Sequence, residues 1–163
     1  MVTIHTQDIE AVIDRALENK LKNILFISRT LEYEPALEWF EKHPDYRACR
    51  ATPAALYEEK HGILVKNEDF FVIDSDSLAN ANSDKCIWFC HTFSEKSMFN
   101  FDGFTDIIKN RFYVNRFPDG HQTHHSLENM AMFIAFTTPH NENDWAALDQ
   151  KYYRLFDEIY IVA

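Results

Sequence analysis

Short apolar runs alternate with helix-like segments along the whole chain, and this alternation limits the possible folds more than any other feature. The runs are four or five residues long, which suits strands better than helices. They occupy 24–27, 70–73, 87–90, 132–136 and 159–162. Continuous apolar runs are typical of strands buried on both faces. The pattern therefore predicts an α/β domain with a mostly parallel central sheet flanked by helices in three layers.

Helical patterns lie between these runs. Apolar residues recur at helical spacing from Ile9 to Leu17, and Pro35 suits the first turn of a helix that continues through Phe40. Further expected elements are helices at 103–112 and 145–153, a short strand at 46–50, a helical turn at 52–59, and a hairpin or loop in FYVNRFPDGHQ. With 163 residues and no clear linker, residues 1–163 are expected to form a single domain.

The net charge of the chain makes negatively charged partners unfavourable. The chain has 16 basic and 26 acidic residues, a net charge of −10, which disfavours nucleic acid and anionic membranes and suits a basic protein partner. No apolar run approaches the roughly 20 residues that span a bilayer, and the first residues do not resemble a signal peptide. Cys49, Cys86 and Cys90 form no even framework, so reduced thiols and a cytoplasmic location are expected.

The segment ILFISRTLEYEP passes from a strand into a helix, where many nucleotide-binding proteins carry G-x-x-x-x-G-K-[ST]. Alignment to that motif places Ser28 and Tyr33 at the two glycines, Glu34 at the lysine and Pro35 at the Ser/Thr. Glu34 reverses the charge that would neutralise phosphates, while Pro35 offers neither a hydroxyl nor an N–H. The whole chain has only three glycines, so we expect no bound nucleotide cofactor.

Later segments follow in a recognisable order: CIWFCHTFS, FTDIIKNRFYVNRFPDG, MFIAFTTPHNEND and LDQKYYRLFDEIYIV. Together with the first loop, they resemble the core of an AAA+ ATPase of the MoxR-like and phage-encoded branch. The resemblance covers nearly the whole chain. It implies a P-loop-type α/β sandwich, allows a homo-oligomer, and allows a phage as the source.

The resemblance also implies that the catalytic residues are lost. His91 and Thr92 take the positions of the acidic Asp-Glu pair, Thr138 that of the polar sensor, and Arg154, displaced by the extra Leu155, that of the arginine finger. FVIDSDS, with Asp74 and Asp76, is a rival place for the acidic pair. The sequence stops at Ala163, directly after the last expected strand, so we expect the family's helical lid to be absent.

We therefore expect a catalytically inactive pseudo-ATPase that acts as a protein-interaction, assembly or structural factor. The alternative from the enzyme class is a residual nucleotide-binding ATPase, active only in an oligomer where another subunit contributes residues.

A weaker alternative is a small metal-dependent enzyme built on His121, His124 and His125 in GHQTHHS. Their H-x-x-H-H spacing lacks the glutamate of the helical protease motifs, so surface histidines and no metal site are expected. Cys90 and His91 are adjacent on a predicted strand and would face opposite sides, which makes them poor catalytic partners.

Aromatic and basic residues gather between positions 99 and 117. This mixture fits the edge of a core or a protein interface better than a nucleic-acid surface in so acidic a chain. The candidate interface residues are Phe99, Phe101, Arg111, Tyr113, Arg116 and Phe117.

Overall fold

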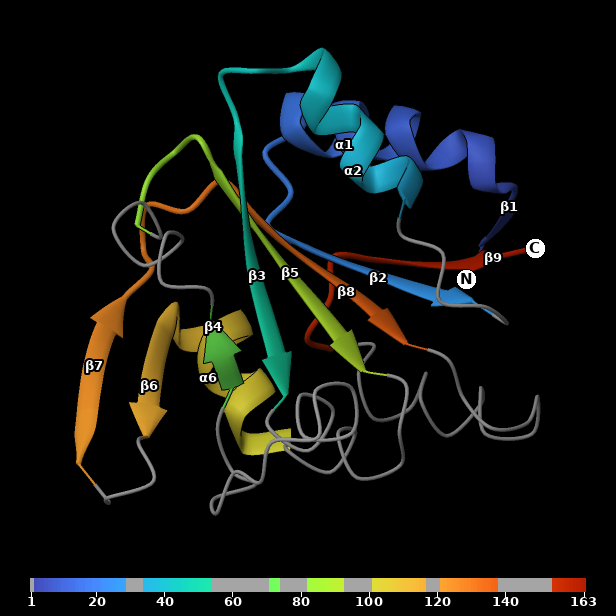
Figure 1. Cartoon of the computed structure of the whole chain (residues 1–163). Helices are drawn as coiled ribbons and strands as arrows, with labels where there is room; N and C mark the ends of the chain where they lie inside the picture. The colour runs from blue at the N-terminus through green and yellow to red at the C-terminus, as the bar shows by residue number, and fades with distance from the viewer. Residues whose placement is uncertain are drawn as a thin grey trace.

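A seven-stranded sheet organises the chain in the computed structural model, which describes residues 2–28, 34–53, 71–73, 82–92, 101–116, 121–137 and 154–163 (Figure 1). The elements are β1 (Val2–Ile4), a 3-10 helix (Thr6–Asp8), α1 (Ile9–Glu18), β2 (Asn23–Ser28), α2 (Glu34–Lys42), β3 (Arg47–Pro53), β4 (Phe71–Ile73), β5 (Cys86–Thr92), α6 (Phe101–Asn110), β6 (Phe112–Arg116), β7 (Gln122–Ser126), β8 (Met132–Thr137) and β9 (Glu158–Val162).

The strand order is β1-β9-β2-β8-β5-β3-β4. Every neighbouring pair from β1 to β3 is parallel, and only the edge strand β4 runs antiparallel to its neighbour. Because β1 pairs with β9, the two ends of the chain lie side by side (Figure 1). The predicted α/β class with a mostly parallel sheet is confirmed.

The helices cover both faces of the sheet, as the direction of the connections requires. From β1 to β2 and from β2 to β3 the chain crosses the sheet in one direction, whereas from β5 to β8 it crosses back. Parallel crossovers are right-handed, so opposite directions place their helices on opposite faces. Accordingly α1 and α2 lie on one face and α6 lies on the other, which gives three layers (Figure 1).

The core explains why the central strands read as continuous apolar runs. Successive side chains of a strand point to opposite faces, and both faces of β2, β5 and β8 are covered. In β2, Leu25 and Ile27 join the cluster on the α6 face, while Ile24 and Phe26 join the cluster on the α1–α2 face. The same alternation continues along β5 and β8.

The hairpin β6–β7 is a separate two-stranded antiparallel sheet that follows α6. The predicted hairpin is therefore confirmed, and its turn residues 117–120 lie outside the described part of the chain. Tyr113 of β6 packs against Trp88 of β5, with 5.5 Å between the ring centroids. This contact anchors the hairpin to the α6 face of the sheet.

Three local features differ from the predictions. The helix expected at 103–112 is α6 (Phe101–Asn110), and Phe112 begins β6. Thr52 and Pro53, expected to begin a helical turn, complete β3, because they pair with Val72 and Phe71 of β4. The three-residue strand β1 was not predicted, since so short and half-exposed a run has no clear period. The helix expected at 145–153 lies outside the described residues.

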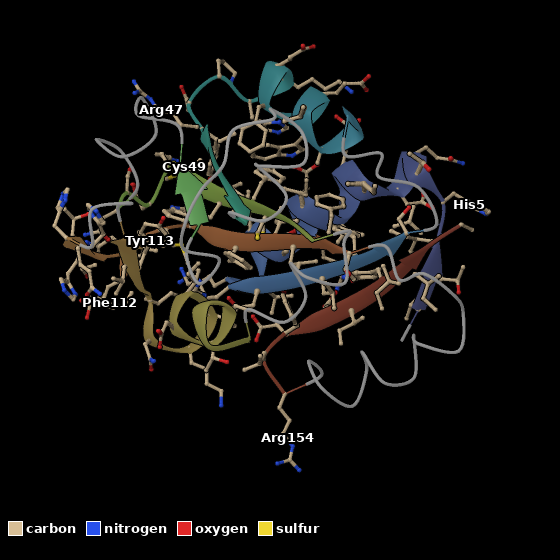
Figure 2. The ribbon with its side chains drawn as sticks, turned by 60° about the horizontal axis from the view of Figure 1, so that its bottom comes forward. His5, Arg47, Cys49, Phe112, Tyr113 and Arg154 are labelled. Carbon is tan, nitrogen blue, oxygen red and sulfur yellow. A yellow bond between two sulfur atoms is a disulfide. The ribbon has the colours of Figure 1, made fainter. Side chains whose placement is uncertain are left out.

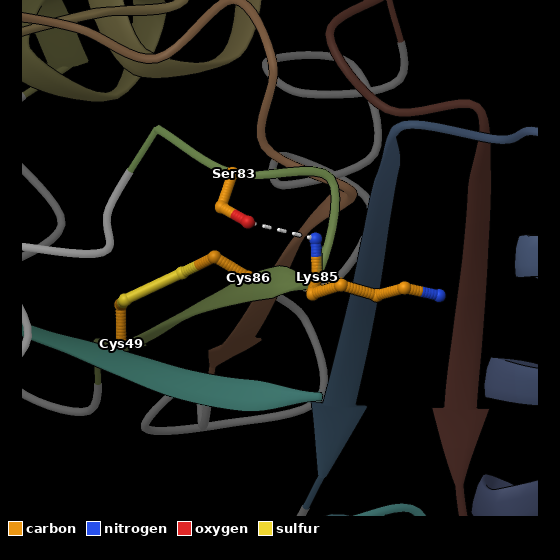
Figure 3. The surroundings of a disulfide bond; sticks show 4 residues. All are labelled: Cys49, Ser83, Lys85 and Cys86. Carbon is orange, nitrogen blue, oxygen red and sulfur yellow. Dashed lines mark hydrogen bonds between the residues drawn. A yellow bond between two sulfur atoms is a disulfide. The ribbon is translucent and has the colours of Figure 1, made fainter. Parts of the chain in front are cut away.

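The prediction of three reduced thiols is wrong for two of them. A disulfide joins Cys49 of β3 to Cys86 of β5 (Figure 3). Cys90 is free and buried. The two Cα atoms lie 6.6 Å apart, within the roughly 4.4–6.8 Å that a disulfide spans. The parallel pairing of β3 with β5 creates this proximity between residues 37 positions apart, so the spacing of the cysteines could not reveal it.

Among the helices that the structure describes, none has the length and apolar character needed to cross a membrane.

Candidate functional site

Three motif positions that are far apart in the sequence meet at the carboxyl edge of the sheet. β8 lies between β2 and β5, and Thr137 of β8 has Ile27 of β2 and Thr92 of β5 as its Cα partners. In open α/β sheets, ligands bind outside the carboxyl ends of the strands. We call these strand ends, residues 27–28, 91–92 and 137, the motif edge.

The β2 end of the motif edge leads to the phosphate-loop positions. Ser28 is buried at the end of β2, Tyr33 lies outside the described residues, and α2 begins with Glu34 and Pro35. Pro35 is thus in the first turn of a helix, as predicted. The start of a helix attracts anions through free backbone N–H groups and the helix dipole. Proline removes one of these donors and a glutamate adds negative charge, so this helix start is a poor phosphate site.

The β5 end of the motif edge carries the positions of the acidic pair. His91 and Thr92 are the last residues of β5, and their Cα partners on β8 are Phe136 and Thr137. An imidazole and a hydroxyl do not supply the carboxylate oxygens on which Mg²⁺ sites depend. The rival acids Asp74 and Asp76 lie outside the described residues.

The β8 end of the motif edge carries a polar residue that the sequence did not single out. Thr137 is 2% exposed, and among the described residues no group forms a hydrogen bond with its Oγ1. Thr138, the predicted sensor-like residue, lies outside the described residues. The Thr-Thr pair after MFIAF was the available signal, but only the strand register shows which threonine ends β8.

Arg154 is far from the motif edge within one chain. It is exposed in the turn before β9, at the amino edge of the sheet, and Figure 2 shows its side chain pointing away from the sheet. The five residues of β9 separate the two edges by roughly 16 Å. A finger-like role for Arg154 would therefore require a second copy of the chain.

Tyr113 must be corrected as an interface candidate. Its side chain is 2% exposed and belongs to the core cluster on the α6 face. Residues of a hairpin strand alternate between two faces, and position 113 takes the inner one. Burial raises the pKa of its hydroxyl well above the ordinary value, with a smaller contribution from Cys90.

The remaining interface candidates are placed only in part. Phe99 and Phe117 lie outside the described residues, and Phe101 and Arg116 are described by their backbone alone, in α6 and β6. Arg111 is half-buried between α6 and β6.

Arg111 belongs to a polar cluster at the amino edge of the sheet. Burial lowers the pKa of its guanidinium, and the charge of Asp157 opposes that shift. The Asp157 Oδ2 atom accepts hydrogen bonds from the backbone N–H groups of Lys22 at 2.7 Å and Asn23 at 2.9 Å. This carboxylate therefore fixes the start of β2. Local sequence pattern could not predict this role, because Lys22 and Asn23 are more than a hundred positions away from Asp157.

The three histidines of GHQTHHS do not converge. His121 and His124 are exposed, whereas His125 is half-buried with its Nε2 atom 3.0 Å from Thr123 Oγ1. As neighbours on β7, His124 and His125 face opposite sides of the hairpin. Within the described ranges, no three His, Cys, Asp or Glu side chains are grouped so that they could hold a metal ion.

Two open hollows lie at the amino edge, away from the motif edge. The first has a volume of about 580 Å³ and is lined by Lys22, Asn82, Ser83, Asp84, Glu128 and Asn129. The second has a volume of about 470 Å³ and is lined by Val2, Arg15, Asp157, Glu158, Ile159 and Tyr160. In the second hollow, Arg15 forms an ion pair with Glu158, so the positive charge of Arg15 is already balanced by a neighbouring carboxylate.

In comparisons with known proteins, no family model matches the chain and no curated protein matches it significantly.

Proposed function

We propose that this protein is a catalytically inactive AAA+-like domain that acts as a protein-interaction, assembly or structural factor. One observation carries this proposal: the strand ends that would build an ATPase site are neighbours, yet they carry none of its charged groups. The resemblance requires the phosphate-loop, sensor and acidic-pair strands to end at one edge. β2, β8 and β5 do so, although their last residues are spread from Ser28 to Thr137.

The residues at that edge explain the loss of catalysis. Phosphoryl transfer depends on positioned cations, namely a lysine and Mg²⁺, and on groups that orient the attacking water. Glu34 replaces the lysine, while His91 and Thr92 replace the carboxylates. Each change removes or reverses a charge on which ATP binding or hydrolysis depends. We therefore propose that the fold is kept while catalysis is lost.

The remaining surface is then the functional part of the molecule. A net charge of −10 favours a basic protein partner and disfavours nucleic acid. A cytoplasmic location stays a prediction that the Cys49–Cys86 disulfide does not support, and the family branch allows a phage origin.

A residual ATPase that is active only in an oligomer is the second candidate. The observation that favours it is the position of Arg154, which is exposed at the amino edge, a strand length away from the motif edge of its own chain. No observation favours the metal-dependent enzyme, since His124 and His125 face opposite sides of the hairpin.

The thermal midpoint with and without millimolar Mg-ATP or Mg-ADP separates these candidates. A ligand at 100 times its dissociation constant would stabilise the fold by about 2.7 kcal/mol, a shift of roughly 5–10 °C for a chain of this size. We expect no shift beyond that given by Mg²⁺ alone. A clear nucleotide-dependent rise would contradict the inactive-loop interpretation and favour the oligomeric ATPase.

A further inference from the structure

All three cysteines project into the core cluster on the α6 face of the sheet. Cys49 comes from β3, whereas Cys86 and Cys90 both come from β5. The Cα partner of Cys49 on β5 is Trp88. Cys86 and Cys90 lie two residues before and two residues after Trp88, so their side chains point to the same face of the sheet as Trp88. Strand β5 thus offers Cys49 two thiol neighbours, and the structure joins it to Cys86.

Cys90 is kept out of thiol exchange by its surroundings. Its side chain is fully buried, and burial raises the pKa of its thiol well above the ordinary value. Only a thiolate attacks a disulfide, so a thiol that stays protonated near neutral pH is inert. The Cys49–Cys86 pairing is therefore maintained while β5 stays in the sheet.

The disulfide lies near one lateral edge of the sheet. β3 is the last of the parallel strands, and beyond it the described sheet has only the three-residue strand β4. Edge elements with few neighbours open more readily than central strands. A covalent link from β3 to β5 restrains that opening, because it holds together two segments that are 37 positions apart in the chain.

We propose that the Cys49–Cys86 disulfide is a redox-controlled staple that fixes the β3 edge of the sheet, and that its reduction releases this edge. In the reductive step a dithiol breaks the S–S bond, its two hydrogens pass to the sulfurs of Cys49 and Cys86, and the dithiol itself becomes a cyclic disulfide. Both sulfurs are buried, so reduction proceeds through opening of the β3 edge. The staple concerns the pairing of β3 with β5 and not the chemistry of the motif edge, so it holds whether or not the protein binds nucleotide.

Thiol counting and hydrogen exchange test the staple on the intact protein. In denaturant, the protein purified without reductant should show one free thiol, Cys90, and the protein treated with dithiothreitol should show three. After reduction, the amides of β3 and β4 should exchange faster by a factor of about ten or more, because the cross-link no longer restrains local opening. The amides of β2 and β8 should keep their exchange rates.

Two variants provide matched controls. Cys86→Ser should show fast exchange in β3 with or without dithiothreitol, whereas Cys90→Ser should keep the full response to the reductant. Three free thiols in the unreduced protein would overturn the staple, as would unchanged exchange of β3 after reduction. These two readouts use the wild-type chain, so they remain decisive if a variant does not fold.

Discussion

Tyr113 and Cys90 are weak acids that the interior of the protein keeps protonated. Each is at most 2% exposed, and for each the largest cause of the raised pKa is burial, which disfavours the charged form. The charged forms, a phenolate and a reactive thiolate, are therefore suppressed near neutral pH. At this scale, burial decides what a side chain can do.

The free energy of unfolding should consequently fall at alkaline pH. The ordinary pKa values are 9.0 for the thiol and 10.0 for the phenol, and both are raised in the folded state. The stabilisation is complete below these values. Above them the unfolded chain releases a proton that the folded chain retains, so stability decreases as pH rises.

For Tyr113 the expected slope above pH 10 is about 1.4 kcal/mol per pH unit. In urea titrations between pH 8 and 11, the difference in slope between the wild type and Tyr113→Phe should be small below pH 9 and approach this amount only near pH 11, with the smaller loss of stability in Tyr113→Phe. Tyr46→Phe, which removes a hydroxyl from a half-buried ring, is the matched control. Equal alkaline slopes in the wild type and Tyr113→Phe would contradict this account.

Thr137 supports a second prediction at the residue scale. A buried hydroxyl without a hydrogen-bond partner costs stability, and valine has the same shape without that hydroxyl. Thr137→Val should therefore raise the free energy of unfolding by about 1 kcal/mol, measured by urea denaturation. Thr137→Ser, which keeps the hydroxyl but loses a methyl group, should lower it. A loss of stability in Thr137→Val would show that the hydroxyl is bonded after all.

At the scale of the elements, a strand could be predicted from the sequence when both of its faces are buried. The strands β2, β5 and β8 were predicted to within two residues at each end, because a strand covered on both faces must be largely apolar. By contrast, β1 and the last residues of β3 are defined by pairing with strands far away in the sequence. The disulfide depends on the same kind of long-range pairing, so local pattern could not predict it.

Asp157 connects the start of β9 with the start of β2, and its removal tests how these strands are fixed. Asp157→Ala leaves the N–H groups of Lys22 and Asn23 without their acceptor and removes the charge that attracts Arg111. We expect the free energy of unfolding to fall by about 2 kcal/mol in urea titrations. Glu128→Ala, an exposed carboxylate at the same edge, should change it by less than about 0.5 kcal/mol. Equal effects of both substitutions would contradict this role.

At the scale of the whole molecule, the sheet brings together motif positions that local pattern could only order along the chain. The sequence placed His91, Thr92 and the phosphate-loop residues at strand ends, and topology brings those ends into one row. Local pattern could not predict which threonine ends β8, because this depends on the strand register. It also could not predict that Tyr113 points into the core, because this depends on the packing of the hairpin. The proposed loss of catalysis therefore depends on residue chemistry at an edge that only the fold assembles.

Calorimetric titration of Mg-ADP tests this central claim most directly, on the wild type and on a variant with a restored loop. The variant combines Ser28→Gly, Tyr33→Gly, Glu34→Lys and Pro35→Thr, which rebuilds the phosphate-binding motif after β2. We predict no measurable binding to the wild type and binding at micromolar to millimolar affinity, about −4 to −8 kcal/mol, to the variant. Binding by the wild type, or none by a correctly folded variant, would contradict the AAA+-like pseudo-enzyme.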